Sequence, residues 1–269
     1  MDLSAVATNI RTTIIDMLAA AGSGHTAGPL GMADIFTALY FKVLKHDPLN
    51  PEWEERDRVV LSNGHITPVR YAAMAHAGYF PVEECLTLRK FGSRLQGHPE
   101  RSKLPGLETT SGPLGSGLSQ ASGMAYGLRM DGKPNWVYCL MSDGEQQEGN
   151  TWEAVLFAGK YKLANLIAIM DRNYIQIDGK TEDIMPLDPM KDKYVAFNWH
   201  VIDVDGNDID AFVQAVEEAK QVKDKPTLII AETVPGKGVP EIEGDYRWHG
   251  KAPKKEEVQK FKEAITSHA

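Results

Sequence analysis

The stretch from residue 135 to residue 173 constrains the fold of this chain more than any other. Two short apolar runs, 135–141 and 166–170, are separated by a helical stretch at 149–164. Two strands that are joined by a crossover helix form a βαβ unit, in which the strands run parallel. The sequence therefore predicts two parallel strands whose carboxyl ends lie at the same edge of a sheet.

Polar residues follow both predicted strands, with Asp143 and Gly144 after the first and Asn173 after the second. Open α/β sheets bind ligands at the carboxyl ends of their strands. Mg²⁺ usually takes a few protein oxygens together with phosphate oxygens and water, so one carboxylate, one amide and one backbone carbonyl would suffice. Gly144 lets the backbone approach a phosphate closely. Asp-Gly alone is equally typical of a simple turn, but the spaced Asn173 favours a cation site that holds a diphosphate.

The size and composition of the chain are those of an ordinary soluble globular protein. Its 269 residues, 42% hydrophobic and 25% charged, suffice for one large α/β domain with a sizeable core. The net charge of −8 argues against nucleic acid or an anionic membrane as the main partner.

The cysteines and the N-terminus predict a cytoplasmic protein. Cys85 and Cys139 lie far apart and lack metal-ligand spacing, which indicates two reduced thiols. Residues 1–21 lack the basic start and the apolar run of a secretory signal. No window approaches the ~18 apolar residues of a membrane span.

The rest of the chain alternates between helical and strand patterns, which predicts one doubly wound, mostly parallel sheet with helices on both faces. The expected helices are 3–21, 32–44, 67–78, 81–90, 118–130, 209–222 and 254–268, and the expected strands are 58–61, 200–204 and 227–231. Asp208 is expected to cap the helix at 209–222. The expected loops are 23–31, 94–117, 174–198 (a loop or a surface hairpin) and 233–253. A loop as long as 94–117 is usually functional in a compact domain.

Four of the eight histidines stand beside a glycine, since His25, His65 and His98 follow one and His249 precedes one. Each lies in or next to an expected loop, where the glycine leaves the imidazole accessible to a ligand. The alternative for any one of them is a histidine that satisfies backbone groups or faces solvent. That structural role is what we expect for the other four, which are His46, His76, His200 and His268. The spacing does not predict a zinc site, because zinc ligands must converge on one point.

Seven segments, spread in order over about 230 residues, carry a resemblance to a known family. They are SGHTAGPLGMADI (23–35), RDRVVLSNGH (56–65), GHPE (97–100), TTSGPLGSG (109–117), SDGEQQEG (142–149), DRNYIQIDG (171–179) and GKG…HGKAP (236–253). Together they resemble the N-terminal, diphosphate-binding part of transketolase. Asp143-Gly144, followed thirty positions later by Asn173, resembles the thiamine diphosphate motif of that family.

The sequence departs from the family pattern at three positions. Ser142 replaces the first glycine of the motif, Thr26 replaces a usual proline, and Ile66 follows His65 where a small residue is usual. None of these changes removes an expected ligand. We expect Ile66 to reshape the pocket beside His65.

The resemblance implies thiamine diphosphate and Mg²⁺ as cofactors, with Ca²⁺ or Mn²⁺ as substitutes for Mg²⁺. The implied metal ligands are Asp143, Asn173 and the backbone oxygen of Ile175. The other implied cofactor contacts are His65, His249 and Gly144 at the diphosphate, and Gly112, Pro113 and Leu114 at the two rings. The side chain of Leu114 would support the bent cofactor.

The resemblance also assigns roles to polar residues around the rings. Histidines at the positions of His25, His98 and His249 line the channel for the sugar, where they would bind substrate and transfer protons. Glu148 resembles an acidic residue that transketolases place at the subunit interface between two cofactor sites. Its alternative is a glutamate in the first turn of a helix, which the helix dipole favours.

Residues 1–269 correspond to a single diphosphate-binding domain, whereas a full transketolase continues into a pyrimidine-binding domain and a C-terminal domain. The glutamate that activates the cofactor belongs to the second domain. The resemblance therefore implies a split transketolase, whose C-terminal subunit is a separate chain in an α2β2 heterotetramer. The implied substrates are sugars, with pentose phosphates and the pentose phosphate pathway as the default, and neither nucleic acid nor a membrane is an expected partner.

Three alternatives remain open at this point. A 2-oxo-acid dehydrogenase α subunit is disfavoured by the SGH, NGH and HGKAP segments, and a deoxyxylulose phosphate synthase by the short chain. A non-catalytic relative that kept the fold is disfavoured by the presence of Asp143, Asn173, His65 and His249.

Overall fold

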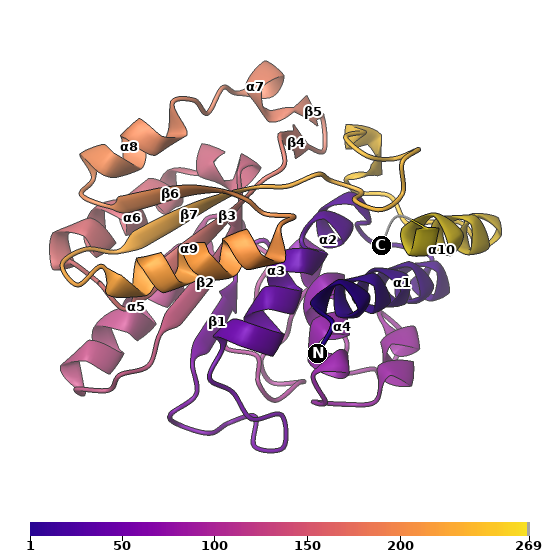
Figure 1. The fold of residues 1–269 in the computed structure, drawn as a ribbon, viewed down its shortest axis with the longest axis horizontal. Coiled ribbons are helices and arrows are strands. Elements are labelled where there is room, and N and C mark those ends of the chain that lie inside the picture. The colour runs from indigo at the N-terminus through magenta and orange to yellow at the C-terminus, as the bar shows by residue number, and fades with distance from the viewer. Residues whose placement is uncertain (268–269) are drawn as a thin grey trace.

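The computed structural model describes residues 1–267, and one parallel sheet forms its middle layer (Figure 1). The strands are β1 (Arg58–Leu61), β2 (Val137–Ser142), β3 (Leu166–Arg172), β6 (His200–Asp205) and β7 (Thr227–Glu232), in the spatial order β1-β2-β3-β7-β6. Every neighbouring pair in this sheet is parallel. All residues of β2 and β3 are buried, as expected for strands that are covered on both faces.

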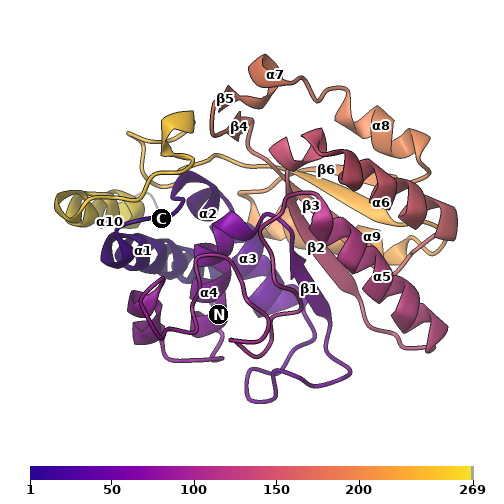
Figure 2. The same ribbon diagram turned by 180° about the vertical axis from the view of Figure 1, so that it is seen from behind.

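Helices cover both faces of the sheet, which confirms the doubly wound α/β fold. The first core joins the sheet to α1 (Leu3–Ala21), α3 (Ala33–Ala38), α4 (Thr67–His76), α9 (Ile209–Gln221) and α10 (Val258–Ser267). The second core joins it to α5 (Ser116–Met130), α6 (Gly149–Tyr161) and α8 (Met190–Ala196), which are seen from behind in Figure 2.

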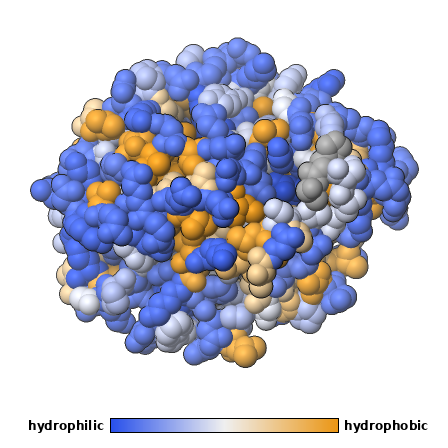
Figure 3. All heavy atoms as spheres, viewed as in Figure 1, coloured by the Kyte–Doolittle hydropathy of each residue, from blue (hydrophilic) through white to orange (hydrophobic). Residues whose placement is uncertain are grey.

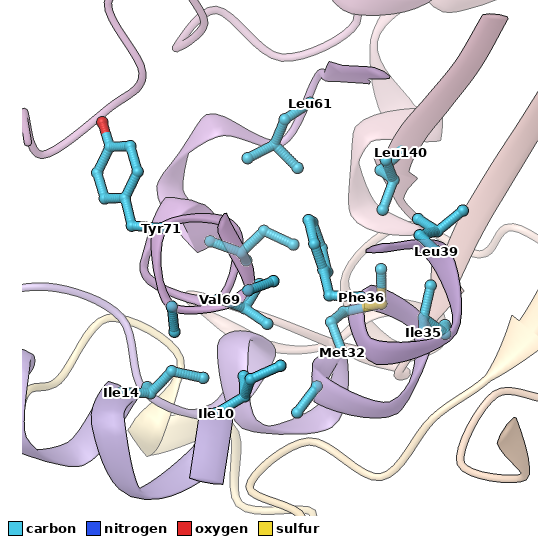
Figure 4. Close-up of a cluster of buried hydrophobic side chains, with 14 of the residues drawn as sticks. Ile10, Ile14, Met32, Ile35, Phe36, Leu39, Leu61, Val69, Tyr71 and Leu140 are labelled. Atoms are coloured by element: carbon cyan, nitrogen blue, oxygen red, sulfur yellow. The ribbon is translucent and has the colours of Figure 1, made fainter. Parts of the chain in front are cut away.

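Side chains of β2 alternate between these two cores, as the period of a strand requires. Tyr138 and Leu140 belong to the first core, and Cys139 belongs to the second. In Figure 4, Phe36 of α3 lies among the side chains of the first core, together with Leu140.

The parallel register brings the ends of β2 and β3 together. Ser142 pairs with Asp171 in the sheet, so Asp143 and Asn173 follow at the same edge. The expected βαβ unit is therefore confirmed.

Two predicted helix boundaries are confirmed, namely the end of α1 and the start of α9. α1 begins after Asp2, whose carboxylate accepts from the N–H of Ala5, and ends at Gly22, which has a φ of 67° that favours glycine. Asp208 caps α9 by accepting from the N–H of Ala211. Such caps contribute about 1 kcal/mol each.

Several predicted boundaries were wrong, mostly because short helices have too few residues to show a period. The expected loop 23–31 contains α2 (Ala27–Gly31), and 174–198 contains α7 (Thr181–Ile184) and α8 besides the expected hairpin, β4 (Ile175–Gln176) with β5 (Gly179–Lys180). The expected helix 81–90 is a 3-10 helix at Val82–Thr87, and 32–44 ends in a π-helical turn at Leu39–Val43. The last expected helix begins with a 3-10 turn, and its predicted end at His268 lies outside the described residues.

Candidate active site

A cavity of about 340 Å³ lies at the carboxyl edge of the sheet. It brings together residues that the sequence predicted from distant segments, namely His25, His65, His98, Gly112, Leu114, Gly144, Glu148, Asn173, Ile175 and His249. Asp143 and Pro113 adjoin these lining residues in the chain. Ile66 also lines the cavity beside His65, as expected.

Asp143 adjoins the cavity through its chain neighbours Ser142 and Gly144, which line it. Its carboxylate is fully buried, and Oδ1 accepts from the N–H of Gly144 at 2.7 Å. Oδ2 accepts from the N–H of Tyr174 at 2.8 Å and from Nη1 of Arg172 at 3.2 Å. Burial raises the pKa of Asp143 to about 6, although Arg172 and the backbone donors lower it. The group is therefore mostly ionised at neutral pH.

The donors next to Asp143 suit a hard cation. Asn173 and Ile175 line the same cavity and can offer an amide oxygen and a backbone carbonyl. In residues 1–267 no three His, Cys, Asp or Glu side chains come together to hold a metal. One carboxylate and two neutral oxygens fit Mg²⁺ only if a ligand such as a diphosphate completes its shell.

Three histidine rings meet in this cavity. The ring centroids lie 4.8 Å apart for His25 and His65, 5.5 Å for His25 and His249, and 5.2 Å for His65 and His249. His98 lines the same cavity from the loop 94–117.

The pKa of each of the four cavity imidazoles is lowered, which favours the neutral form at pH 7. Burial, with His249, Arg89 and His98 nearby, lowers the pKa of His25 to about 4. Burial also lowers the pKa of His65, His98 and His249. Within residues 1–267, Nδ1 of His25 is buried without a hydrogen-bond partner. A neutral imidazole can donate and accept, so this cluster can bind hydroxyl groups and pass protons.

Three of the other four histidines contact groups of the fold, as expected. His46 contacts Tyr79 Oη and the carbonyl of Tyr40. His76 contacts Thr13, and His200 contacts Glu218. His268 lies outside the described residues.

Glu145 holds the glycine-rich loop 112–115, part of which lines the cavity. The sequence did not predict this role of Glu145. This buried carboxylate accepts from Ser62 Oγ after β1, from the N–H of Gly115 and from the N–H of Ser142. Burial raises the pKa of Glu145 to about 7. Its place two residues after Asp143 was the available signal, but its partners lie far away in the sequence.

Glu148 is exposed at the rim of the cavity and occupies the N-cap position of α6. Its side chain makes no capping hydrogen bond in the described part of the chain. Gln147, Gln176 and Ile177 line the cavity without having been predicted, and Ile177 is 64% exposed. One wall of the cavity is thus open.

The family described as "Transketolase, thiamine diphosphate binding domain" matches residues 3–268. The chain belongs to the transketolase family. It is 45% identical to the 6-deoxy-6-sulfo-D-fructose transketolase subunit SqwG of Clostridium sp. (strain MSTE9), over 93% of this chain and 90% of that protein. It is 39% identical to an apulose-4-phosphate transketolase subunit of Phocaeicola vulgatus, over 93% and 88% respectively.

Solved transketolases have the same fold. The structure from Leishmania mexicana superposes with a TM-score of 0.92 at 35% identity, over 99% of this chain and 41% of that one. The structure from Campylobacter jejuni has a TM-score of 0.92 at 37% identity, over 98% and 42%. The chain therefore spans about two fifths of these solved transketolases, and it matches the domain that is described as thiamine diphosphate binding. These matches support transketolase over the other two thiamine enzymes.

Proposed function

We propose that this chain is the N-terminal subunit of a two-chain transketolase, which transfers a two-carbon ketol unit from a ketose to an aldose. The convergence of His25, His65 and His249 in one cavity that Asn173 also lines carries this proposal. It is supported by relatives that are named as transketolase subunits and that match over nearly their whole length.

Asp143, Asn173 and the backbone oxygen of Ile175 would hold Mg²⁺, for which Ca²⁺ or Mn²⁺ can substitute, and the metal would hold the cofactor diphosphate. His65, His249 and Gly144 would contact that diphosphate. The rings would lie on the loop formed by Gly112, Pro113 and Leu114. When bound, thiamine diphosphate supplies the nucleophilic carbon that carries the two-carbon unit.

The chain's own catalytic residues are His25, His98 and His249. Their neutral imidazoles can donate to a substrate carbonyl or accept from a hydroxyl, which positioning and proton transfer both require. We assign substrate binding to the same three residues, with sugar phosphates as the default substrates. The names of the two relatives differ in the tail of the ketose, so the tail is where specificity is expected to differ.

The open wall of the cavity supports a partner subunit that carries the pyrimidine-binding domain. Ile177 and Met185 are 64% and 59% exposed, and both belong to the segment that follows β3. Glu148 at the rim would face a second cofactor site in an α2β2 heterotetramer. On the face shown in Figure 3, further apolar residues gather near the middle of a mostly hydrophilic surface. Residues 1–269 would form one domain of this assembly.

The location of this enzyme is proposed to be cytoplasmic, in keeping with the free cysteines Cys85 and Cys139. None of the helices in residues 1–267 has the length and apolar character of a membrane span.

The test is to express the chain with and without its partner subunit. Alone it should show weak cofactor binding and no ketol transfer, and the partner should restore both and increase the mass measured by light scattering. Full activity of the lone chain, with the partner shown to be absent by mass spectrometry, would refute the two-chain proposal.

A further inference from the structure

The side-chain amide of Asn173 is held in one orientation by two hydrogen bonds. Its Nδ2 donates to Oδ2 of Asp171 over 2.7 Å, and its Oδ1 accepts from the N–H of Ile175 over 3.0 Å. A carboxylate accepts and a backbone N–H donates, so both partners require the same orientation of the amide. An amide oxygen has two lone pairs, and one therefore remains for a ligand in the cavity.

Asp171 itself is fixed and removed from solvent. It lies in β3 between Ser142 of β2 and Ala231 of β7, and only 1% of the residue is exposed. Its Oδ1 accepts from the hydroxyl of Thr233, which follows β7. Burying a carboxylate is costly unless its oxygens are hydrogen-bonded. Both oxygens of Asp171 are hydrogen-bonded, because Oδ1 accepts from Thr233 and Oδ2 accepts from Asn173.

We propose that Asp171 is a positioning residue that fixes the amide oxygen of Asn173 toward the cation of the cofactor site. The proposal rests on the metal site proposed above, and Asp171 itself does not line the cavity. Without this acceptor only the N–H of Ile175 orients the amide, and a half-turn would present its NH₂ group, which cannot bind a cation. Mutating the hydrogen-bond partner of a metal ligand typically lowers metal affinity by about 10- to 100-fold.

The test measures Mg²⁺ affinity in the presence of thiamine diphosphate, by calorimetry on the full chain assembled with its partner. Asp171→Asn keeps the size of the side chain but can donate as well as accept, so it permits both orientations of Asn173. We expect Asp171→Asn to weaken Mg²⁺ binding by about 10- to 100-fold.

A double variant, Asp171→Asn with Asn173→Asp, exchanges the two groups. Residue 171 then donates to a carboxylate at residue 173, whose second oxygen faces the cation whichever way it turns. The exchange conserves the total charge, and it should recover most of the affinity that the single change loses. A double variant that binds Mg²⁺ no better than Asp171→Asn overturns the proposal, because a purely structural role predicts no rescue. The exchange also restores the lost charge, so the uncharged pair Thr233→Val and Thr233→Ser separates positioning from an electrostatic effect.

Asp34→Asn provides the matched control, since Asp34 is another buried carboxylate, paired with Arg11 away from this cavity. It should lower stability without changing Mg²⁺ affinity. If the double variant does not fold, Thr233→Val and Thr233→Ser replace it, and only the valine variant should weaken Mg²⁺ binding. Unchanged affinity in Asp171→Asn overturns the positioning role alone, whereas unchanged affinity in Asp143→Ala overturns the metal site and this inference together.

Discussion

Arg172 donates from Nη1 to Oδ2 of Asp143 over 3.2 Å, so the residue before Asn173 neutralises the carboxylate at the end of the neighbouring strand. The side chain of Arg172 is 2% exposed, and that of Asp143 is fully buried. Arg172 also pairs with Glu182 and Asp188. It therefore links the cofactor edge of the sheet to the segment after the hairpin.

Replacing this arginine should destabilise the fold. Arg172→Met leaves Asp143 buried without its ion-pair partner, and breaking a buried pair costs about 3 kcal/mol. Urea unfolding of the apo chain measures this loss. Arg94→Met is the matched control, because Arg94 pairs with Glu84 in a more exposed setting and should cost about 0–1 kcal/mol. If the two variants lost equal free energy of unfolding, burial would not explain why the Arg172–Asp143 pair matters more than the Arg94–Glu84 pair.

Removing the acidic metal ligand should abolish cofactor binding. Asp143→Ala takes away the carboxylate that is proposed to hold Mg²⁺, while the sheet around it stays buried. Calorimetry on the assembled enzyme should show no Mg²⁺-dependent binding of thiamine diphosphate, and circular dichroism should show an unchanged fold. Wild-type cofactor affinity in this variant would exclude Asp143 as a ligand.

The cavity histidines should separate into two groups by kinetics. His25→Ala or His98→Ala should lower kcat/KM by roughly tenfold or more, the low end for a positioning or proton-transfer group, with cofactor affinity nearly unchanged. His249→Ala should lower both, because this residue is assigned to cofactor and substrate. Steady-state kinetics and cofactor titration on the same preparations measure the two effects. An equal loss of cofactor affinity in all three variants would show that the roles are wrongly assigned.

The low pKa of His25 predicts how stability depends on pH. The pKa is about 4 in the folded chain and 6.5 as the ordinary value. Between these values the unfolded chain binds more protons, so the stability linked to His25 is present above pH 6.5 and is lost as the pH falls. On going from pH 7 to pH 5, His25→Asn should lose about 1–2 kcal/mol less than the wild type. Urea unfolding at both pH values measures this, and identical losses would contradict a neutral, buried imidazole.

The sequence predicted the strands that position the site better than the contacts among its side chains. Short apolar runs located the two strands, and their parallel order placed Asp143 and Asn173 at one edge. The glycine-flanked histidines were likewise predicted one at a time. Their convergence to about 5 Å depends on loops from both ends of the chain, which no local pattern encodes.

The residues that hold the ligands in place were missed for a related reason. Asp171 and Arg172 resemble an ordinary polar strand end, and Glu145 resembles part of a turn. Their roles arise from partners such as Thr233 and Ser62, which lie 62 and 83 positions away. A carboxylate whose partners are that distant gives no signal in sequence spacing.

Ile177 is exposed at the wall of the cofactor cavity, so a partner subunit that covers it would couple cofactor binding to subunit assembly. If a partner subunit covers this wall and tightens cofactor binding, the cofactor must tighten assembly by the same factor, because coupling between two sites is reciprocal. The concentration of thiamine diphosphate would then control the amount of assembled enzyme as well as its activity. A lower concentration of thiamine diphosphate would then shift the equilibrium toward separate subunits.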